Sequence, residues 1–170
     1  LTNGPLLNLF EKKVKSFLKC NYSIACSSGT AALELAISSL KLRKNSTIIM
    51  PAINFVASYN ICKKMNLKVY LADVDEETGQ MKPNHVIECM RFNKLKKVNL
   101  IINMYMAGFP ENVIEFAKLK KKLKCYLIED ACHALGGKYN NFKVGSCKYS
   151  DISTFSFHPV KPITTGEGGM

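Results

Sequence analysis

The fold is indicated most directly by the segment ENVIEFAKLKKKLKCYLIED, residues 111–130, in which a helical stretch leads straight into a short apolar one. We predict a helix over Glu111–Leu123 and a strand over Cys125–Glu129, because the apolar run inside the second stretch has the length and composition of a buried strand. The strand is followed by a carboxylate, Asp130. A helix that leads directly into an apolar strand is typical of α/β folds.

The same alternation extends along the chain on both sides of this segment. Helices are predicted over Leu6–Leu18, Ala31–Leu42, Phe55–Met65 and Asn84–Phe92. Strands are predicted over Tyr22–Cys26, Thr47–Met50, Lys68–Ala72 and Val98–Asn103, with short strands and turns over Lys138–Phe157. This pattern predicts one α/β domain with a mainly parallel sheet that helices cover on both faces.

The composition is that of a globular protein, with 47% hydrophobic and 22% charged residues in a chain of 170. No apolar run approaches the roughly 18 residues of a membrane span, and the start of the chain lacks a secretory signal pattern, so we expect a cytoplasmic protein without membrane contact. The seven cysteines are odd in number and no two are separated by two residues. They are therefore expected to be reduced thiols rather than disulfides or ligands of a metal.

The net charge of +11 would suit a nucleic-acid partner. However, Arg43 and Arg91 are the only arginines among the 24 basic residues, and arginine is the side chain that makes forked contacts to phosphate and guanine. The lysines are spread along helical stretches such as Lys118–Lys124, which is typical of a solvated face. We therefore expect no nucleic-acid partner.

Parallel sheets bind ligands at the carboxyl ends of their strands, and polar residues gather at such places in this chain. Ser27–Thr30 joins a predicted strand to a helix. Its glycine, its hydroxyls and the free amides of the helix N-terminus form a pattern that suits a phosphate, with plain helix capping as the alternative. The segment is neither a Walker loop nor a dinucleotide fingerprint.

Two charged residues follow other predicted strands. Asp130 lies at the end of an apolar strand, where a carboxylate is costly unless a cation pairs with it. A protonated heterocyclic nitrogen would be one such cation; a helix cap or an internal ion pair is the alternative. Lys161 follows the apolar and aromatic residues of Phe155–Val160, which would desolvate its amine and favour attack on a carbonyl, unless it is an ordinary surface lysine.

Taken together, the phosphate cradle, the carboxylate and the desolvated lysine match the chemical groups of one cofactor. Pyridoxal 5'-phosphate has a phosphate, a pyridine nitrogen and an aldehyde, and its enzymes bind it through a lysine Schiff base and an acidic partner of the ring nitrogen. The sequence therefore predicts a pyridoxal-phosphate enzyme.

At these residues the chain resembles the DegT/DnrJ/EryC1/StrS family of sugar aminotransferases. The resemblance runs over nearly the whole length, in blocks that keep the family's order. They are Thr2–Pro5, Ser27–Leu33, Pro51–Ala57, Asp73–Asp75, Glu129–Gly136, Ser156–Lys161 and Thr164–Gly169. Within the family, Val144–Asp151 and Thr78–Met81 resemble the aminotransferases of pseudaminic-acid biosynthesis, which aminate C4 of a UDP-linked 4-keto-6-deoxy-N-acetylhexosamine.

The resemblance implies the large domain of a pyridoxal-phosphate-dependent transferase of the aspartate aminotransferase type (type I). It also implies glutamate as the usual donor and a homodimer. The chain begins without an initiator methionine and stops in the glycine-rich Gly166–Met170. We expect residues 1–170 to be part of that large domain, with a C-terminal small domain absent, and this fragment alone to be inactive.

The resemblance also implies roles for single residues. Lys161 would form the Schiff base and later move a proton, Asp130 would keep the pyridine nitrogen protonated, and His133 would touch the 3-hydroxyl or the ring, unless it is a structural histidine. Phe55 matches the aromatic residue that stacks on the ring. The phosphate-binding positions correspond to Thr30, Ala31 and Ser156, with Gly29 providing room.

One position departs from the family pattern, because Asn54 stands where threonine is usual. Dehydratases of the same fold carry histidine at the lysine position, so Lys161 favours transamination. Two alternatives stay open: a non-catalytic regulatory or binding protein with the same cofactor fold, and an aminotransferase that acts on another nucleotide-linked keto sugar.

Overall fold

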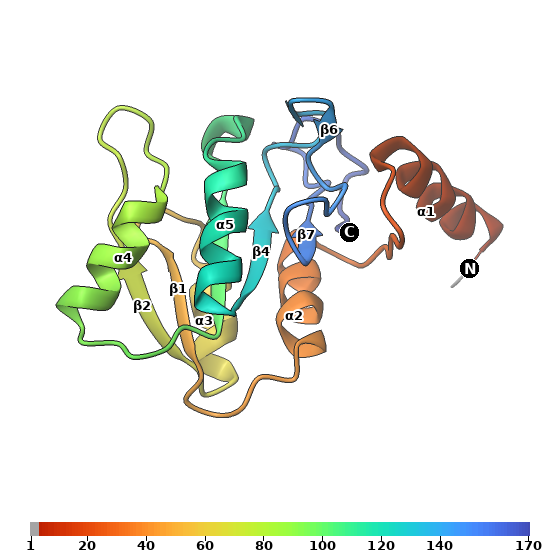
Figure 1. The fold of residues 1–170 in the computed structure, drawn as a ribbon. Coiled ribbons are helices and arrows are strands. Elements are labelled where there is room, and N and C mark those ends of the chain that lie inside the picture. Colours follow the sequence, from red (N-terminus) through yellow and green to blue (C-terminus); the bar gives the residue numbers. More distant parts are fainter. Residues whose placement is uncertain (1–3) are drawn as a thin grey trace.

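The computed structural model describes residues 4–170, so that Thr2 and Asn3 of the first family block lie outside the described residues. Its centre is a parallel sheet in the order β2-β1-β3-β4-β7 (Figure 1). These strands are β1 (Thr47–Pro51), β2 (Lys68–Ala72), β3 (Leu100–Met104), β4 (Tyr126–Asp130) and β7 (Ile152–Thr154). The predicted mainly parallel α/β fold is confirmed.

The helices are α1 (Pro5–Leu18), α2 (Gly29–Ser39), α3 (Ala57–Lys64), α4 (Pro83–Phe92) and α5 (Val113–Leu123), with a short 3-10 helix at Met106–Gly108. A small antiparallel hairpin pairs β5 (Lys138–Tyr139) with β6 (Phe142–Lys143). The strand order reverses direction at β1, whose neighbours are β2 on one side and β3 on the other. Ligands of such sheets bind beyond the carboxyl ends of the strands, near a switch of this kind.

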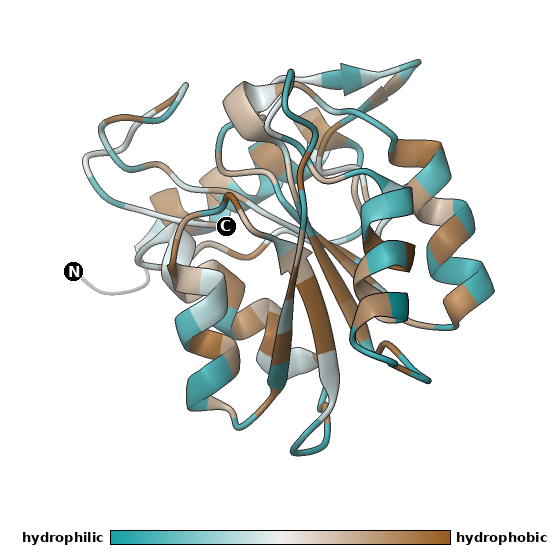
Figure 2. Cartoon of the chain, turned by 90° about the vertical axis from the view of Figure 1, so that its left-hand side faces the viewer, coloured by the Kyte–Doolittle hydropathy of each residue, from teal (hydrophilic) through white to brown (hydrophobic). Residues whose placement is uncertain are grey.

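Two apolar layers hold the helices against the sheet. One layer joins α2 and α3 to residues such as Ile48, Ile102 and Ile128; the other joins α4 and α5 to Ile101 and Leu127. Figure 2 shows strands that are hydrophobic along much of their length, between helices that alternate hydrophobic and hydrophilic residues. Because both faces are covered, the central strands β1 and β3 are mostly apolar, as expected for a buried parallel sheet.

A third apolar cluster surrounds the end of the sheet at β7. The α1 helix contributes Leu18 and Phe10, and the ring of Phe10 meets that of Phe157 edge to face, with centroids 5.3 Å apart. Met170 and Phe155 exchange two backbone hydrogen bonds, with N···O distances of 2.8 and 3.1 Å. The end of the described chain is thus tied to the segment that follows β7.

The predicted strand over Tyr22–Cys26 is wrong. In this segment only Cys26 pairs, through an isolated antiparallel bridge to Gly169, while the side chains of Tyr22 and Ile24 are 85% and 66% exposed. A strand needs a neighbour along its length, and the described chain gives this segment a partner only at one residue. The other predicted elements are present, with ends that differ by a few residues.

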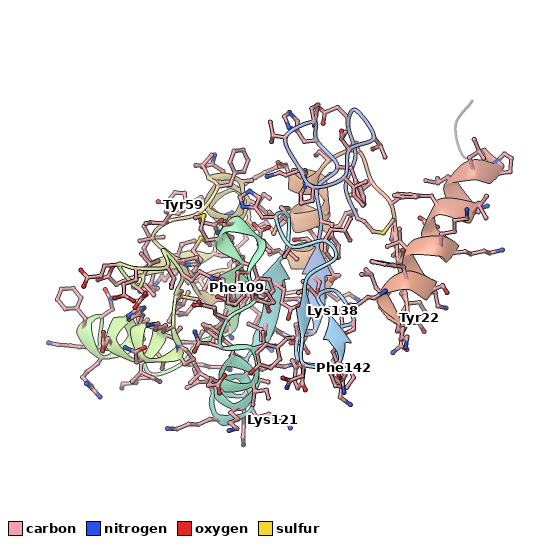
Figure 3. The ribbon with its side chains drawn as sticks, turned by 90° about the horizontal axis from the view of Figure 1, so that it is seen from above. Tyr22, Tyr59, Phe109, Lys121, Lys138 and Phe142 are labelled. Carbon is pink, nitrogen blue, oxygen red and sulfur yellow. The ribbon has the colours of Figure 1, made fainter. Side chains whose placement is uncertain are left out.

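All seven cysteines are free thiols in the structure. Cys62, Cys89 and Cys125 are buried, whereas the other four are partly exposed. Three lysines of α5, Lys118, Lys121 and Lys122, are exposed, and Lys121 extends away from the molecule in Figure 3. Over residues 4–170, no helix combines the length and the hydrophobicity needed to cross a membrane.

Candidate functional site

The N-terminus of α2 follows the segment that the sequence analysis compared to a phosphate cradle. The Ser28 hydroxyl caps the helix by accepting a hydrogen bond from the amide of Ala31, at 3.1 Å. Ser28 therefore caps the helix, which is the alternative function considered for this segment, and the Ala31 amide is already hydrogen-bonded to Ser28. The amides of Gly29 and Thr30 belong to the first turn, which has no intrahelical acceptors, and they are the donors that remain for an anion.

Gly29 brings this helix end against two distant segments. A Cβ atom built on Gly29 would lie 2.7 Å from the Cβ of Ser156 and 3.2 Å from the Sγ of Cys132. Such a distance is too short for two carbon atoms, so only glycine allows this approach. The contact places the Ser156 side chain against the first residue of α2.

We expect Gly29→Ala to destabilise the fold and to weaken anion binding at this helix end, because the added methyl group must displace Ser156. The expected loss is about 1–3 kcal/mol in the free energy of unfolding, the usual cost of overpacking. Urea unfolding measures it. Gly4→Ala is the matched control. Gly4 is the N-cap residue of α1, as Gly29 is the first residue of α2, but a Cβ atom on Gly4 would meet open space. Equal stability of the two variants would contradict the packing described here.

Asp130 ends β4 and is almost fully buried, with 3% of its surface exposed. Its Oδ1 accepts a hydrogen bond from the amide of Cys132, at 3.3 Å. Burial raises the pKa of the Asp130 carboxyl above its usual value, while the hydrogen bonds from Cys132 and the positive charges of His133 and Lys161 act against that rise. Asp130 is thus a buried acid within electrostatic reach of both other residues proposed for catalysis.

Lys161 lies in a loop whose base is fixed by Phe157. The amide of Phe157 donates to the carbonyl of Gly168 at 2.9 Å, and its carbonyl accepts from Thr165 at 3.0 Å. The expected desolvation of Lys161 by its sequence neighbours is wrong for the described chain. Val160 is 77% exposed and Lys161 itself is only partly buried, because the loop stands out from the core at this point.

His133 and Phe55 complete the set of predicted residues. Burial and the positive charge of Lys161 lower the pKa of His133, and the negative charge of Asp130 acts against that lowering. Phe55 follows β1 and is 67% exposed, which leaves its ring free to stack. Asn54 uses both ends of its amide locally: Oδ1 accepts from the Phe55 amide at 2.7 Å, and Nδ2 donates to Ser58 at 3.0 Å.

The structure therefore brings most of the predicted site together. Gly29 contacts Ser156 and Cys132, the Cys132 amide binds Asp130, and the charges of His133 and Lys161 act on Asp130. Sequence reasoning missed Cys132, which links the helix end to the buried acid. Its signal was its spacing, since aspartate often accepts a hydrogen bond from the amide two residues later.

The donor set fits the predicted cofactor. A buried carboxylate, which here has no ion pair with a basic side chain in the described chain, suits a protonated ring nitrogen. The amides of Gly29 and Thr30 with the Ser156 hydroxyl suit a phosphate, and the glycine at position 29 is what lets these two segments approach each other. Lys161 supplies the amine.

Comparisons with known proteins agree with this chemistry. The sequence profile of the DegT/DnrJ/EryC1/StrS aminotransferase family matches residues 1–170. The GDP-perosamine synthase of Escherichia coli O157:H7 is 36% identical over 169 residues, which cover 99% of this chain and 45% of that protein. The UDP-4-amino-4,6-dideoxy-N-acetyl-beta-L-altrosamine transaminase of Campylobacter jejuni (strain NCTC 11168) is 34% identical, with coverages of 99% and 44%.

A solved structure adds the fold and a cofactor. NtdA from Bacillus subtilis, solved with bound cofactor PMP, superposes with a TM-score of 0.88 and 29% sequence identity, covering 99% of this chain and 37% of that one. The chain thus spans less than half the length of these relatives.

Proposed function

The chain belongs to the DegT/DnrJ/EryC1/StrS aminotransferase family, and from this membership we propose that it is part of the cofactor-binding large domain of a pyridoxal-phosphate-dependent sugar aminotransferase. The full-length protein would transfer an amino group from an amino acid, glutamate in our proposal, to a keto carbon of a nucleotide-linked sugar. The observation that carries the proposal is the junction of Gly29, Ser156 and Cys132 beside the buried Asp130.

Most of the predicted residues have a task in this proposal, although the Ala31 amide is already engaged by Ser28. Bound pyridoxal phosphate supplies an aldehyde that condenses with amines and a ring that accepts an electron pair from the adjacent carbon. The Asp130 carboxylate holds the proton on the ring nitrogen, and the Gly29 and Thr30 amides with the Ser156 hydroxyl bind the phosphate. Lys161 Nζ would move the proton at the reacting carbon, and the His133 imidazole would contact the 3-hydroxyl or the ring.

For the substrate we propose C4 of a UDP-linked keto-deoxy sugar, as in pseudaminic-acid-type glycan biosynthesis. The support is the likeness to the Campylobacter jejuni transaminase, whose name contains a UDP-linked amino sugar. The similar GDP-perosamine synthase has a name that contains a GDP-linked sugar instead. A nucleotide-linked sugar is therefore the substrate class that these relatives share, and the base of the nucleotide is the part that differs between them. The net charge of +11 suits an anionic nucleotide substrate.

We also propose a homodimer in the cytoplasm. Viewed from the side at which the strands end, Tyr59 and Phe109 lie at the surface (Figure 3), and Phe109 is 65% exposed. Exposed apolar groups near a site suit a second subunit that covers them. Seven free cysteines suit a reducing compartment.

The test is a transamination assay of the full-length protein with glutamate and a panel of UDP-, GDP- and dTDP-linked keto sugars. We expect 2-oxoglutarate to appear, with the highest kcat/KM for the UDP-linked 4-keto-6-deoxy-N-acetylhexosamine. A higher kcat/KM with a GDP- or dTDP-linked sugar would contradict the proposed UDP-linked substrate but would still support aminotransferase activity. Cofactor binding without transfer to any sugar or from any amino acid would overturn catalysis and favour a regulatory or binding protein.

A further inference from the structure

Glu129 lies next to Asp130 in β4 but faces the other side of the sheet. Successive side chains of a strand alternate, so Glu129 shares the face of Leu127, which packs with α4 and α5. Asp130 shares the face of Ile128, which packs with α2 and α3. Glu129 is 5% exposed and is therefore a second buried acid directly behind the candidate site.

The Glu129 carboxylate connects three neighbouring strands. The Tyr105 hydroxyl, just after β3, donates to Oε1 at 2.8 Å, and the Ser153 hydroxyl in β7 donates to Oε2. The strand register places Glu129 opposite Asn103 on β3 and opposite Ser153 on β7. One side chain thus holds the carboxyl ends of β3, β4 and β7 through hydrogen bonds on both of its oxygens.

The surroundings of Glu129 make this arrangement costly for stability. Its side-chain partners are hydroxyl groups, and no lysine, arginine or histidine of residues 4–170 forms an ion pair with it. Burial and the negative charge of Glu129 raise the pKa of Tyr105, which keeps its hydroxyl protonated as a donor. Apolar residues of similar volume are often more stabilising than a buried charge. The presence of Glu129 here therefore points to a role in holding the strand ends in place rather than in stability.

The strand ends held by Glu129 carry the groups of the candidate site. The Tyr105 amide donates to the carbonyl of Asp130 at 3.2 Å, and the Ala131 amide donates to the carbonyl of Thr154 at 2.9 Å. Beyond Thr154 the chain reaches Ser156 within two residues. A shift of β4 against β7 would therefore change the separation between the Asp130 carboxylate and the Ser156 hydroxyl.

We propose that Glu129 is a positioning residue for the aminotransferase reaction, which locks β3, β4 and β7 so that Asp130 and Ser156 stay at the spacing that the cofactor's ring nitrogen and phosphate require. This inference rests on the proposed function. Glu129 does not touch the cofactor, because it lies on the opposite face of the sheet from Asp130. Its effect is transmitted through the backbone of the strand ends.

The experiment compares Glu129→Gln, Tyr105→Phe and the double variant in the full-length protein. Glu129→Gln keeps the shape of the side chain but removes its charge and replaces one of the two accepting oxygens by an NH2 donor. We expect about a 10²-fold loss in kcat, because small misplacements at a reacting centre have effects of this size, with little change in the KM for glutamate. We also expect weaker binding of pyridoxal phosphate added to the cofactor-free protein, and a double variant no worse than Glu129→Gln alone.

The matched controls are Ser46→Ala, a buried serine just before β1 and far from the carboxyl ends, and Tyr70→Phe on the edge strand β2. They should leave cofactor affinity and kcat unchanged. If Glu129→Gln does not fold, Tyr105→Phe and Ser153→Ala, which each remove one donor, decide the question by the same readouts. Wild-type cofactor affinity and kcat in the folded variants would overturn the positioning role alone. A wild-type protein that binds no pyridoxal phosphate would overturn the proposed function as well.

Discussion

The Lys161→Ala variant of the full-length protein is expected to lose its visible cofactor absorbance and at least about 10³-fold of its turnover, while it keeps its fold. The amine at position 161 is the group that binds the cofactor's aldehyde and moves the proton, and neither task can be done by a methyl group. The fold should survive because Lys161 lies in an exposed loop and forms no ion pair in the part of the chain that the structure describes.

The control for Lys161 is Lys148→Ala, which removes a lysine whose Nζ lies 5.3 Å from the ring centroid of Phe142, away from the loop of Lys161. Absorbance spectra and single-turnover assays of both variants measure the effect, and circular dichroism checks the fold. Normal turnover in Lys161→Ala would remove the central residue of the proposed site. Loss of turnover in both variants would instead point to a general effect of lysine removal.

The sequence predicts the sheet well because its core strands carry their own signal. The β2 strand has the predicted bounds, Lys68–Ala72, and β3 and β4 each begin with a run of apolar residues. Tyr22–Cys26 has the same local composition, yet it forms one bridge only. Strand formation depends on a neighbour, and that neighbour is set by the path of the whole chain.

The site is predictable in its residues but not in their surroundings. Asp130 can be predicted from the sequence because an acid directly after an apolar run is unusual. Its burial follows from its position at the end of the buried strand β4. The exposure of Lys161 cannot be predicted from the sequence, because apolar neighbours along the chain do not bury a side chain when the loop that carries them extends away from the core. The contact between Gly29 and Cys132 joins residues far apart in the sequence and follows only from the packing of α2 against the end of the sheet at β7.

The Asp130→Asn variant is expected to separate cofactor binding from stability. An uncharged amide cannot hold the proton on the ring nitrogen, so we expect a loss of about 10² to 10³-fold in kcat and weaker cofactor binding. In the cofactor-free protein the same change should raise the free energy of unfolding at pH 7 by roughly 1–3 kcal/mol, since it removes a buried charge with which no basic side chain of residues 4–170 forms an ion pair.

The raised pKa of Asp130 determines how the stability difference between Asp130→Asn and the wild type changes with pH. Burial raises the pKa of Asp130 in the folded protein above the ordinary value of 3.8, so the folded state binds this proton more tightly than the unfolded state. The resulting stability is fully present below the unfolded pKa and is lost as the pH rises through the folded pKa. The advantage of Asp130→Asn should therefore be largest at neutral pH and shrink toward pH 4, which urea unfolding at several pH values measures.

Asp151→Asn is the matched control for Asp130→Asn, because Asp151 is an acid that the fold uses. It forms an ion pair with Lys120 at 2.5 Å and accepts the amide of Leu127 at 2.8 Å. Its removal should lower stability at pH 7 and leave cofactor affinity unchanged, the reverse of Asp130→Asn on both counts. If Asp130→Asn instead lowered stability and left binding intact, Asp130 would be a structural acid, and the cofactor would need another partner for its ring nitrogen.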